Sequence, residues 1–371
     1  MDIRLKLVTS SLDVKGGAHR VTLKIAQHFK APIYCFDYQP EKTFEEFQDI
    51  EIITPKKTSL RRIPVGRNLV DTIEVFSYFY NLKLDDYDLI NAHISPAEWV
   101  RNKNSPVLWY CYAPYRMAFD LYDWKMKQLS PLKKLKFKTW IAAYKYLEFK
   151  TIPEIEYMFT VSNNSKNRIK KYLKRDAETL YPGIETNKFS CKGYEKFFFY
   201  PSRIDTIKEF EYVIKAFKIF SAKTKGWKLV IAGSTSPFFN EYLEKLKSIS
   251  NENIIIETNI EEDHLLDLYS RCYAVPFSAI DEDLGLVPLE ALASSKPVIA
   301  RNEGGTRETV AEGNDGFLVN SPEEMAQKME WLAKNPDACE KMGKLGRKKV
   351  CKDFTWENFL KRFEEKAREM I

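Results

Sequence analysis

Two glutamates in the second half of the chain have the spacing of a ligand-binding pair. Seven residues separate Glu282 from Glu290, and Gly285 stands three positions after the first glutamate. An apolar run at 274–277 comes before them. Pro288, which is tolerated only in the first turn of a helix, places a helix start near Gly285. The N–H groups of such a first turn bind anions, and a carboxylate at 290 can accept hydrogen bonds from two neighbouring hydroxyls. The segment therefore predicts a site for an anionic, hydroxyl-bearing ligand.

Two cations follow another apolar run at 197–202. Arg203 comes directly after this run, and Lys208 lies five residues later, where we expect the next helix to start. Fixed cations that face a departing phosphate stabilise the charge that develops on it, and so favour the transition state over the ground state. They can also take the place of a divalent metal ion, so we expect no metal requirement.

A glycine pair and a histidine mark the first half of the chain. Gly16 and Gly17 follow the first predicted strand and open a helix, so their N–H groups can approach phosphate or sugar oxygens. His93 ends a predicted strand at 89–93. The fingerprint GxGxxG does not occur in the sequence, which argues against a dinucleotide-dependent oxidoreductase.

The positions of these residues depend on the secondary structure around them. Along the chain, short apolar runs alternate with segments of helical periodicity. The alternation predicts an α/β domain with a mainly parallel sheet, and the continuous apolar character of the runs suits strands buried on both faces. A second alternation restarts near residue 196. The predicted strands are 3–9, 32–36, 89–93, 106–112, 157–162, 197–202, 228–234, 254–257, 274–277, 297–300 and 316–319.

We therefore expect two Rossmann-like domains that face each other across a deep cleft. The first spans 1–185 and the second 186–353, while an amphipathic helix at 354–371 packs back on the first domain. Ligands in such sheets bind outside the carboxyl ends of the strands, where the residues named above are expected.

The segment 274–310 resembles the donor-binding signature of glycosyltransferase family 4, and weaker similarity to the mannosyltransferase-like branch of this family extends over nearly the whole chain. The resemblance implies the GT-B fold and a nucleotide-sugar donor. It also implies catalytic roles for His93, Arg203, Lys208 and Glu282. The donor-binding residues that it implies are Gly16, Gly17, Ser234, Glu282, Leu284, Gly285, Leu286 and Glu290. The acceptor-side residues are Tyr112, Arg116 and Asp120.

By this resemblance the protein transfers a hexose, with mannose as the leading candidate, from a GDP- or UDP-linked donor to a hydroxyl acceptor. The anomeric configuration is retained, and the donor phosphate itself takes the acceptor proton. The leading expectation for the acceptor is a lipid-linked or cell-surface glycan, and a small molecule stays open as an alternative. Two alternatives stay open, namely a nucleotide-sugar 2-epimerase of the same architecture and a non-catalytic nucleotide-sugar binding protein. Leu284 replaces a usual aromatic and Ser295 a common glycine, which implies a reshaped sugar pocket.

The composition and the N-terminal sequence indicate which metal sites, disulfides and cellular location to expect. The six cysteines and four histidines are scattered, so neither a disulfide framework nor a zinc site is expected. The run 281–283 resembles an Asp-x-Asp metal motif, but the glutamate spacing explains it better. The N-terminus has no apolar core of signal-peptide type, and we expect a cytoplasmic protein.

The net charge of +6 is unevenly distributed. Residues 101–180 contain 17 Lys and Arg against 7 Asp and Glu. Within this region, 124–150 interleaves lysines with aromatic residues. Three interpretations are open: a packed helix whose lysines reach solvent, contact with the cytoplasmic face of an anionic membrane, or nucleic-acid binding. We expect no nucleic-acid partner, because no nucleic-acid-binding fold accompanies the stretch.

Overall fold

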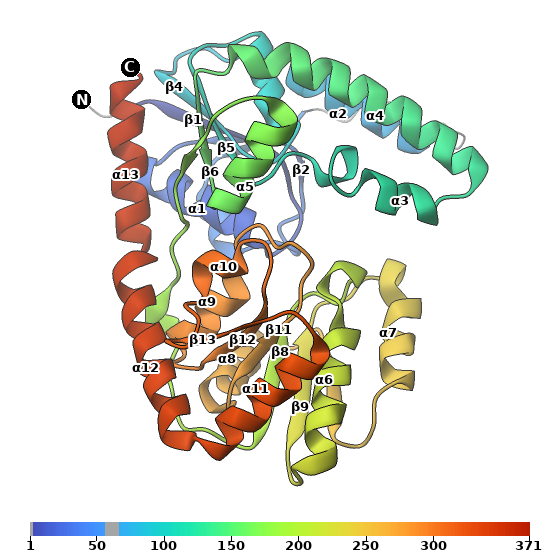
Figure 1. Ribbon diagram of the computed structural model, residues 1–371. Helices are drawn as coiled ribbons and strands as arrows, with labels where there is room; N and C mark the ends of the chain where they lie inside the picture. Colours follow the sequence, from blue (N-terminus) through green and yellow to red (C-terminus); the bar gives the residue numbers. More distant parts are fainter. Residues whose placement is uncertain (1–2, 56–66) are drawn as a thin grey trace. The chain divides into compact units, whose positions relative to one another are not determined.

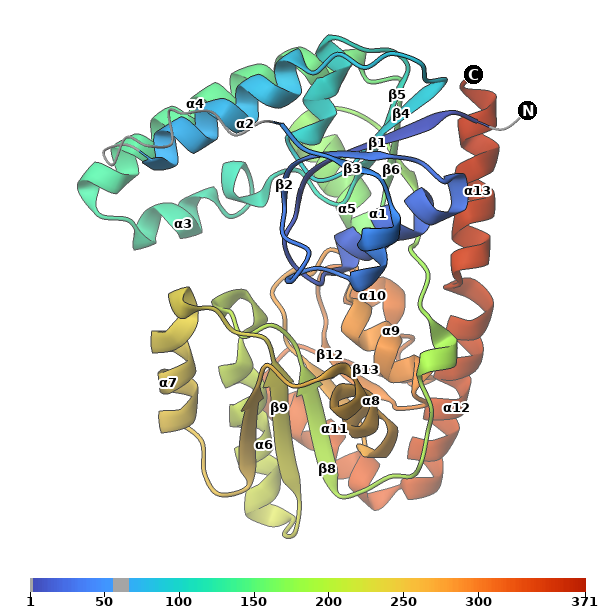
Figure 2. The same cartoon turned by 180° about the vertical axis from the view of Figure 1, so that it is seen from behind.

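The computed structural model describes residues 3–55 and 67–371, which form two compact units (Figures 1 and 2). Unit 1 comprises Met1–Pro182 together with Phe359–Ile371, and unit 2 is the continuous segment Gly183–Asn358. Among the described residues, no helix is both long enough and apolar enough to cross a membrane.

The described part of unit 1 contains a seven-stranded parallel sheet in the order β3-β2-β1-β4-β5-β6-β7. Two of its central strands, β4 and β5, are buried along their whole length, as continuous apolar runs predict. The strands are β1 Leu5–Leu12, β2 Ile33–Tyr38, β3 Ile52–Ile53, β4 Leu89–Ala92, β5 Val107–Cys111, β6 Tyr157–Thr160 and β7 Glu178–Thr179. The helices are α1 Gly17–Phe29, α2 Arg67–Asn81, α3 Tyr122–Gln128, α4 Pro131–Thr151 and α5 Asn163–Arg168.

The end of the last helix, α13 (Trp356–Glu369), belongs to the core of unit 1. Its buried Phe359 packs edge-on against Tyr110 of β5, with ring centroids 5.6 Å apart. Phe363, one turn later, contacts Phe29 of α1 at 5.8 Å and Phe159 of β6 at 6.1 Å. The apolar stripe of α13 therefore completes the aromatic core of unit 1.

Unit 2, which is described throughout, contains two three-stranded parallel sheets, β10-β9-β8 and β11-β12-β13. A bridge between Phe198 and Ala274 joins them, so the strands run in the order 3-2-1-4-5-6 of a Rossmann domain. The strands are β8 Phe197–Pro201, β9 Lys228–Gly233, β10 Ile254–Thr258, β11 Val275–Phe277, β12 Val298–Arg301 and β13 Gly316–Val319. The helices are α6 Phe210–Lys223, α7 Asn240–Ser248, α8 Glu262–Arg271, α9 Leu286–Ala293, α10 Thr306–Thr309, α11 Pro322–Lys334 and α12 Pro336–Asp353.

The prediction of two Rossmann-like α/β folds is confirmed, and every predicted apolar run forms a strand. The two-residue strands β3 and β7 were not predicted, because they are too short to carry a pattern. In unit 1 the strand order reverses between β1 and β4, and in unit 2 between β8 and β11. Loops diverge at such a point and leave room for a ligand at the carboxyl ends of the strands.

Candidate functional site

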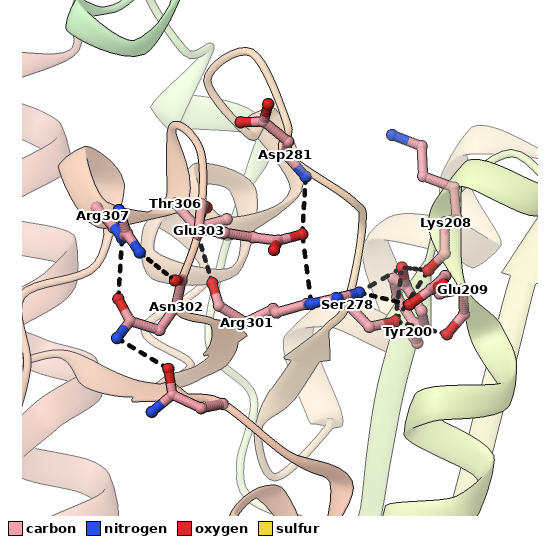
Figure 3. A network of polar contacts seen from close by, with 11 residues as sticks. Tyr200, Lys208, Glu209, Ser278, Asp281, Arg301, Asn302, Glu303, Thr306 and Arg307 are labelled. Carbon is pink, nitrogen blue, oxygen red and sulfur yellow. Dashed lines mark hydrogen bonds and ion pairs between the residues drawn. The ribbon is translucent and has the colours of Figure 1, made fainter. Parts of the chain in front are cut away.

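The predicted residues Arg203, Lys208 and Glu282 of unit 2 lie on the two loops that follow β8 and β11. Backbone and side-chain bonds join these loops: Ile280 N–H donates to Ile207 O at 2.9 Å, and Ser278 Oγ donates to Lys208 O at 2.9 Å. The buried Tyr200 hydroxyl also donates to Lys208 O at 2.7 Å (Figure 3). The backbone of Lys208 is therefore fixed, while its side chain extends away from this cluster (Figure 3).

Lys208 and Glu282 form an ion pair at the point where the strand order reverses. The Lys208 Nζ lies 2.6 Å from the Glu282 Oε2, and the two side chains are 14% and 23% exposed. An ammonium has three N–H donors, and Glu282 takes one of them. The pair thus presents a positioned cation and a positioned carboxylate together.

Lys208 does not start a helix, contrary to the sequence-based expectation. It ends a 3₁₀ turn, Thr206–Lys208, and α6 begins only at Phe210. The Asp205 carboxylate caps this turn by accepting from Ile207 N–H at 3.0 Å. The capped turn places the Lys208 Nζ over the ring of Phe277 at the end of β11, 5.9 Å from the ring centroid, and not on the helix.

Arg203 is far more exposed than Lys208. Its side chain is 65% exposed and lies 3.6 Å from Asp205. The surrounding loop is anchored by Ile204 N–H, which donates to Ser234 O at 2.8 Å. Ser234 follows β9 and is itself exposed, so both predicted donor residues are accessible from solvent.

The glycine pair 304–305 is required by close backbone packing against the Glu282 loop. Gly305 N–H donates to Glu282 O at 2.7 Å. A Cβ at 304 would lie 2.7 Å from the backbone N and O of Glu282, and one at 305 would lie 2.4 Å from Asp283 O. Glu303 also holds this loop through Asp281 N–H at 2.9 Å (Figure 3). Side chains at 304 and 305 would push the Glu282 loop away from Lys208.

Gly285 caps α9, as the position of Pro288 predicts. Its φ of +91° lies in the left-handed region, which favours glycine, and α9 starts at the next residue, Leu286. Leu284 is buried. The first turn of α9 therefore begins directly after the Glu282 loop and presents N–H groups suited to an anion.

Glu290 lies on α9, and its carboxylate is oriented by a residue that sequence reasoning missed. The hydroxyl of buried Tyr269 on α8 donates to Glu290 Oε2 at 2.7 Å. Burial, reinforced by the adjacent carboxylate, raises the pKa of Tyr269 well above its ordinary value, so the hydroxyl keeps its proton. The only sequence signal for this contact is a tyrosine among apolar residues of a helix 21 positions upstream.

In unit 1 the loops after β1 and β4 carry the glycine pair and His93. Gly16 caps α1, and Gly17 is its first residue. The Tyr112 hydroxyl donates to Ala18 O at 2.9 Å, so it has no proton left for His93, whose Nδ1 lies 3.0 Å away. His93 Nδ1 must then carry the proton, which makes Nε2 an acceptor.

Two imidazole nitrogens that can accept a hydrogen bond are buried near the carboxyl ends of β1 and β4. Within the described residues, neither His93 Nε2 nor His19 Nδ1 has a hydrogen-bond partner. His19 Nε2 is bound to Ser11 O at 3.0 Å. Burial, followed by the proximity of His19, lowers the pKa of His93 to about 3, and burial also lowers that of His19. Both rings are neutral hydrogen-bond acceptors. Sequence reasoning missed His19, although a histidine two positions after a glycine pair was a usable signal.

The three predicted acceptor-side residues have different environments in unit 1. Arg116 and Asp120 bind each other, with Arg116 Nε donating to Asp120 Oδ2 at 2.9 Å. Arg168 approaches the same carboxylate at 4.0 Å. The Tyr112 hydroxyl, by contrast, is directed to Ala18 and His93. Arg116 and Asp120 therefore form one polar group, and Tyr112 supports the histidine.

Metal-binding groups do not gather in the described parts of the chain. Residues 3–55 and 67–371 contain no cluster of three or more His, Cys, Asp or Glu side chains suited to a metal ion. The six cysteines all lie within described segments and are free thiols.

Comparison with known proteins agrees with this geometry. Residues 184–349 match the family model of glycosyl transferases group 1. The alpha-1,3/1,6-mannosyltransferase ALG2 of Dictyostelium discoideum is 23% identical, over 93% of this chain and 93% of that protein. The mouse ALG2 is 22% identical, over 93% and 91%. The crystal structure of Anabaena Alr3699/HepE with UDP and glucose has a TM-score of 0.75 at 15% identity and covers 99% of both chains.

The chain has the GT-B fold. The segment that carries Arg203, Lys208, Glu282 and Glu290 is its glycosyl transferases group 1 region, and its full-length relatives include mannosyltransferases.

Proposed function

We propose that the protein is a retaining hexosyltransferase that uses a nucleotide-diphosphate sugar and a hydroxyl acceptor. The observation that carries this proposal is the Lys208–Glu282 pair, held 2.6 Å apart next to the start of α9. A cation, a helix N-terminus and a carboxylate in one place match a ligand that combines a diphosphate with a sugar.

Each group of unit 2 has a role in this proposal. Lys208, Arg203 and the first turn of α9 bind the diphosphate, and Glu290, oriented by Tyr269, accepts hydrogen bonds from the ribose hydroxyls. Glu282 faces the donor sugar. Because Lys208 and Arg203 neutralise the departing diphosphate, the reaction needs no metal ion.

The reaction exchanges one bond at the anomeric carbon. The bond from this carbon to the diphosphate oxygen breaks, and the acceptor oxygen attacks from the same face. The acceptor proton passes to a donor phosphate oxygen, so configuration is retained without a protein base. His93, with its low pKa, accepts a sugar hydroxyl proton in a hydrogen bond and does not remove it.

The relatives guide the choice of substrates. The ALG2 proteins are mannosyltransferases by name, which supports mannose as the transferred sugar, whereas HepE was crystallised with UDP. We propose a GDP- or UDP-linked hexose as donor and a lipid-linked or cell-surface glycan as acceptor.

A thermal-shift panel tests the donor site. GDP-mannose, UDP-glucose and ADP-glucose are added in turn, and we expect one of them to raise the melting temperature, because a donor bound only to the folded protein stabilises it. Glu290→Ala should lose this shift, and Glu340→Ala, which removes an exposed glutamate on α12, should keep it.

Turnover of the donor that binds is then measured as release of nucleoside diphosphate, and NMR reports the anomeric configuration of the product. Release with retention supports the proposal. Epimerised donor without acceptor would show a 2-epimerase, and binding without turnover in the presence of glycan acceptors would show a binding protein. Either result would overturn sugar transfer.

A further inference from the structure

The outer face of α4 in unit 1 carries a continuous row of exposed uncharged side chains. Leu132, Leu135, Tyr146 and Phe149 are 67%, 64%, 70% and 46% exposed. They are four of the ten large exposed hydrophobic residues in the described part of the chain. Steps of three and four residues connect them through exposed Thr139 and Ala142, which places all six on one helical face. We call these six residues the α4 ridge.

The opposite face of α4 already supplies the packing that holds the helix on unit 1. Trp140 stacks with Phe76 of α2 at 6.3 Å, and Tyr144 contacts Trp99 at 5.5 Å. Figures 1 and 2 show α2 and α4 side by side along much of their length. Buried Glu148 accepts a hydrogen bond from Trp99 Nε1 at 2.7 Å. Of the ridge residues, Phe149 also contacts Phe119 edge-on, with ring centroids 6.2 Å apart, whereas Leu132, Leu135 and Tyr146 extend into solvent.

The charges around the ridge are almost all positive. The sequence of α4 contains six lysines and a single acidic residue, Glu148, which is buried on the inner face. Within the described structure, Lys133, Lys134, Lys136 and Lys138 make no ion pair. At about 100° per residue, Lys136 falls on one flank of the ridge and Lys138 on the other.

We propose that the α4 ridge docks on an anionic lipid bilayer, with α4 lying in the plane of the membrane surface. A helix of 21 residues is about 31 Å long, so the ridge offers an extended line of contact. Leucine and aromatic side chains enter the boundary between headgroups and acyl chains, while the flanking lysines reach anionic headgroups. This inference goes beyond the proposed sugar transfer, because it assigns a partner to a surface outside the donor site.

Other occupants fit the ridge less well. A second copy of the chain would bring two rows of lysines together, and the exposed face of α4 has no carboxylate to pair with them. Nucleic acid would satisfy the lysines but would leave the two leucines and Phe149 in water. An anionic bilayer can both bury the apolar side chains of the ridge and bind the lysines on its flanks.

The test is co-sedimentation of the full chain with vesicles of phosphatidylcholine alone or mixed with phosphatidylglycerol. We expect binding to the mixed vesicles, which high salt weakens. Leu135→Ser and the double variant Lys136→Gln/Lys138→Gln should each lower the partition coefficient about tenfold. Matched controls on α12, Leu345→Ser and Lys341→Gln/Lys348→Gln, remove exposed residues of the same types and should bind as the original chain does.

The proposal would be overturned by the absence of binding to mixed vesicles or by an equal loss of binding in the α4 and α12 variants. A dimer in analytical ultracentrifugation that Leu135→Ser dissociates would overturn it as well. Binding to single-stranded RNA in place of the vesicles would also overturn it. The thermal shift produced by the nucleotide sugar serves as a separate readout. It should be unchanged in Leu135→Ser, so failure of membrane docking can be distinguished from failure of the proposed donor site.

Discussion

The two units share a Rossmann strand order but place opposite kinds of polar groups where that order reverses. In unit 2 the loops after β8 and β11 bring Lys208 and Glu282 together as ions, with Arg203 nearby. In unit 1 His19, in the first turn of α1, and His93, directly after β4, are buried as neutral acceptors. One fold thus supports charged and uncharged recognition at equivalent positions.

The difference follows from solvent access. Lys208 and Glu282 form an ion pair and stay partly exposed, with 14% and 23% of their side chains accessible to solvent. His93 is 1% exposed, and burial disfavours its protonated form. Charged groups suit phosphate, whereas neutral acceptors suit hydroxyls. We therefore propose that Lys208 binds the anionic part of the donor and that His93 accepts a hydrogen bond from a hydroxyl group.

The largest effect is expected from the cations of unit 2. Lys208→Ala or Arg203→Ala should lower turnover about 10²-fold or more, because a preorganised charge that faces the leaving diphosphate is lost. Lys218→Ala, which removes an exposed lysine from α6, is the matched control and should leave turnover unchanged. Near-normal turnover in both Lys208→Ala and Arg203→Ala would show that the cations of unit 2 do not act on a leaving diphosphate.

A smaller effect on catalysis is expected when the neutral acceptor His93 of unit 1 is replaced. His93→Phe keeps an aromatic ring but removes the Nε2 acceptor, and should lower kcat/KM about tenfold, the equivalent of one uncharged hydrogen bond. Since the pKa of His93 is about 3, its protonation should not shape the rate profile near neutral pH. His264→Phe, on the surface of unit 2, tests for nonspecific effects. A loss as large as that of Lys208→Ala would mean that His93 acts as more than a neutral acceptor.

The smallest effect concerns stability and a buried acid pair in unit 1. Glu98 and Glu148 are both fully buried, and burial together with their proximity raises the pKa of Glu98 well above its ordinary value of 4.5. Burial also raises the pKa of Glu148. The folded state therefore holds protons that the unfolded state has released, and stability should fall as pH rises from about 4.5 through the raised pKa values.

Glu98→Gln should flatten this dependence, because an amide needs no proton to be buried. Midpoints of urea unfolding, measured as pH is raised, report the slope for each variant. Exposed Glu357→Gln serves as the control and should keep the original slope. An unchanged slope in Glu98→Gln would show that unit 1 does not hold this acid in its protonated form.

Local sequence patterns predicted the parts of the site that depend on local structure. The apolar runs predicted the strands, and Gly285 with Pro288 predicted the start of α9. The spacing of Glu282 and Glu290 placed one on a loop and the other a turn into that helix. Each of these inferences uses residues within about ten positions of one another, where backbone sterics determine the conformation.

Contacts between distant segments could not be predicted in this way. The Lys208–Glu282 pair joins residues 74 positions apart, and the proton on His93 depends on Tyr112, whose hydroxyl is directed to Ala18. The expected helix start at Lys208 failed because Asp205 caps a short turn first. Segment 124–150 divides at Ser130 into α3 and α4. The α4 ridge could not be predicted, because which face of α4 is exposed depends on the aromatic contacts of its inner face with distant residues.

The division of unit 1 between the two ends of the chain has a consequence for biosynthesis. Unit 2 is continuous, so it can complete its core soon after residue 358 leaves the ribosome. Unit 1 begins to emerge first but lacks Phe359 and Phe363 until all of unit 2 has been translated, so its aromatic core closes later than the core of unit 2 can. The unit whose translation begins first is thus completed after the other, and a nascent chain stalled before α13 would expose Tyr110 and Phe159.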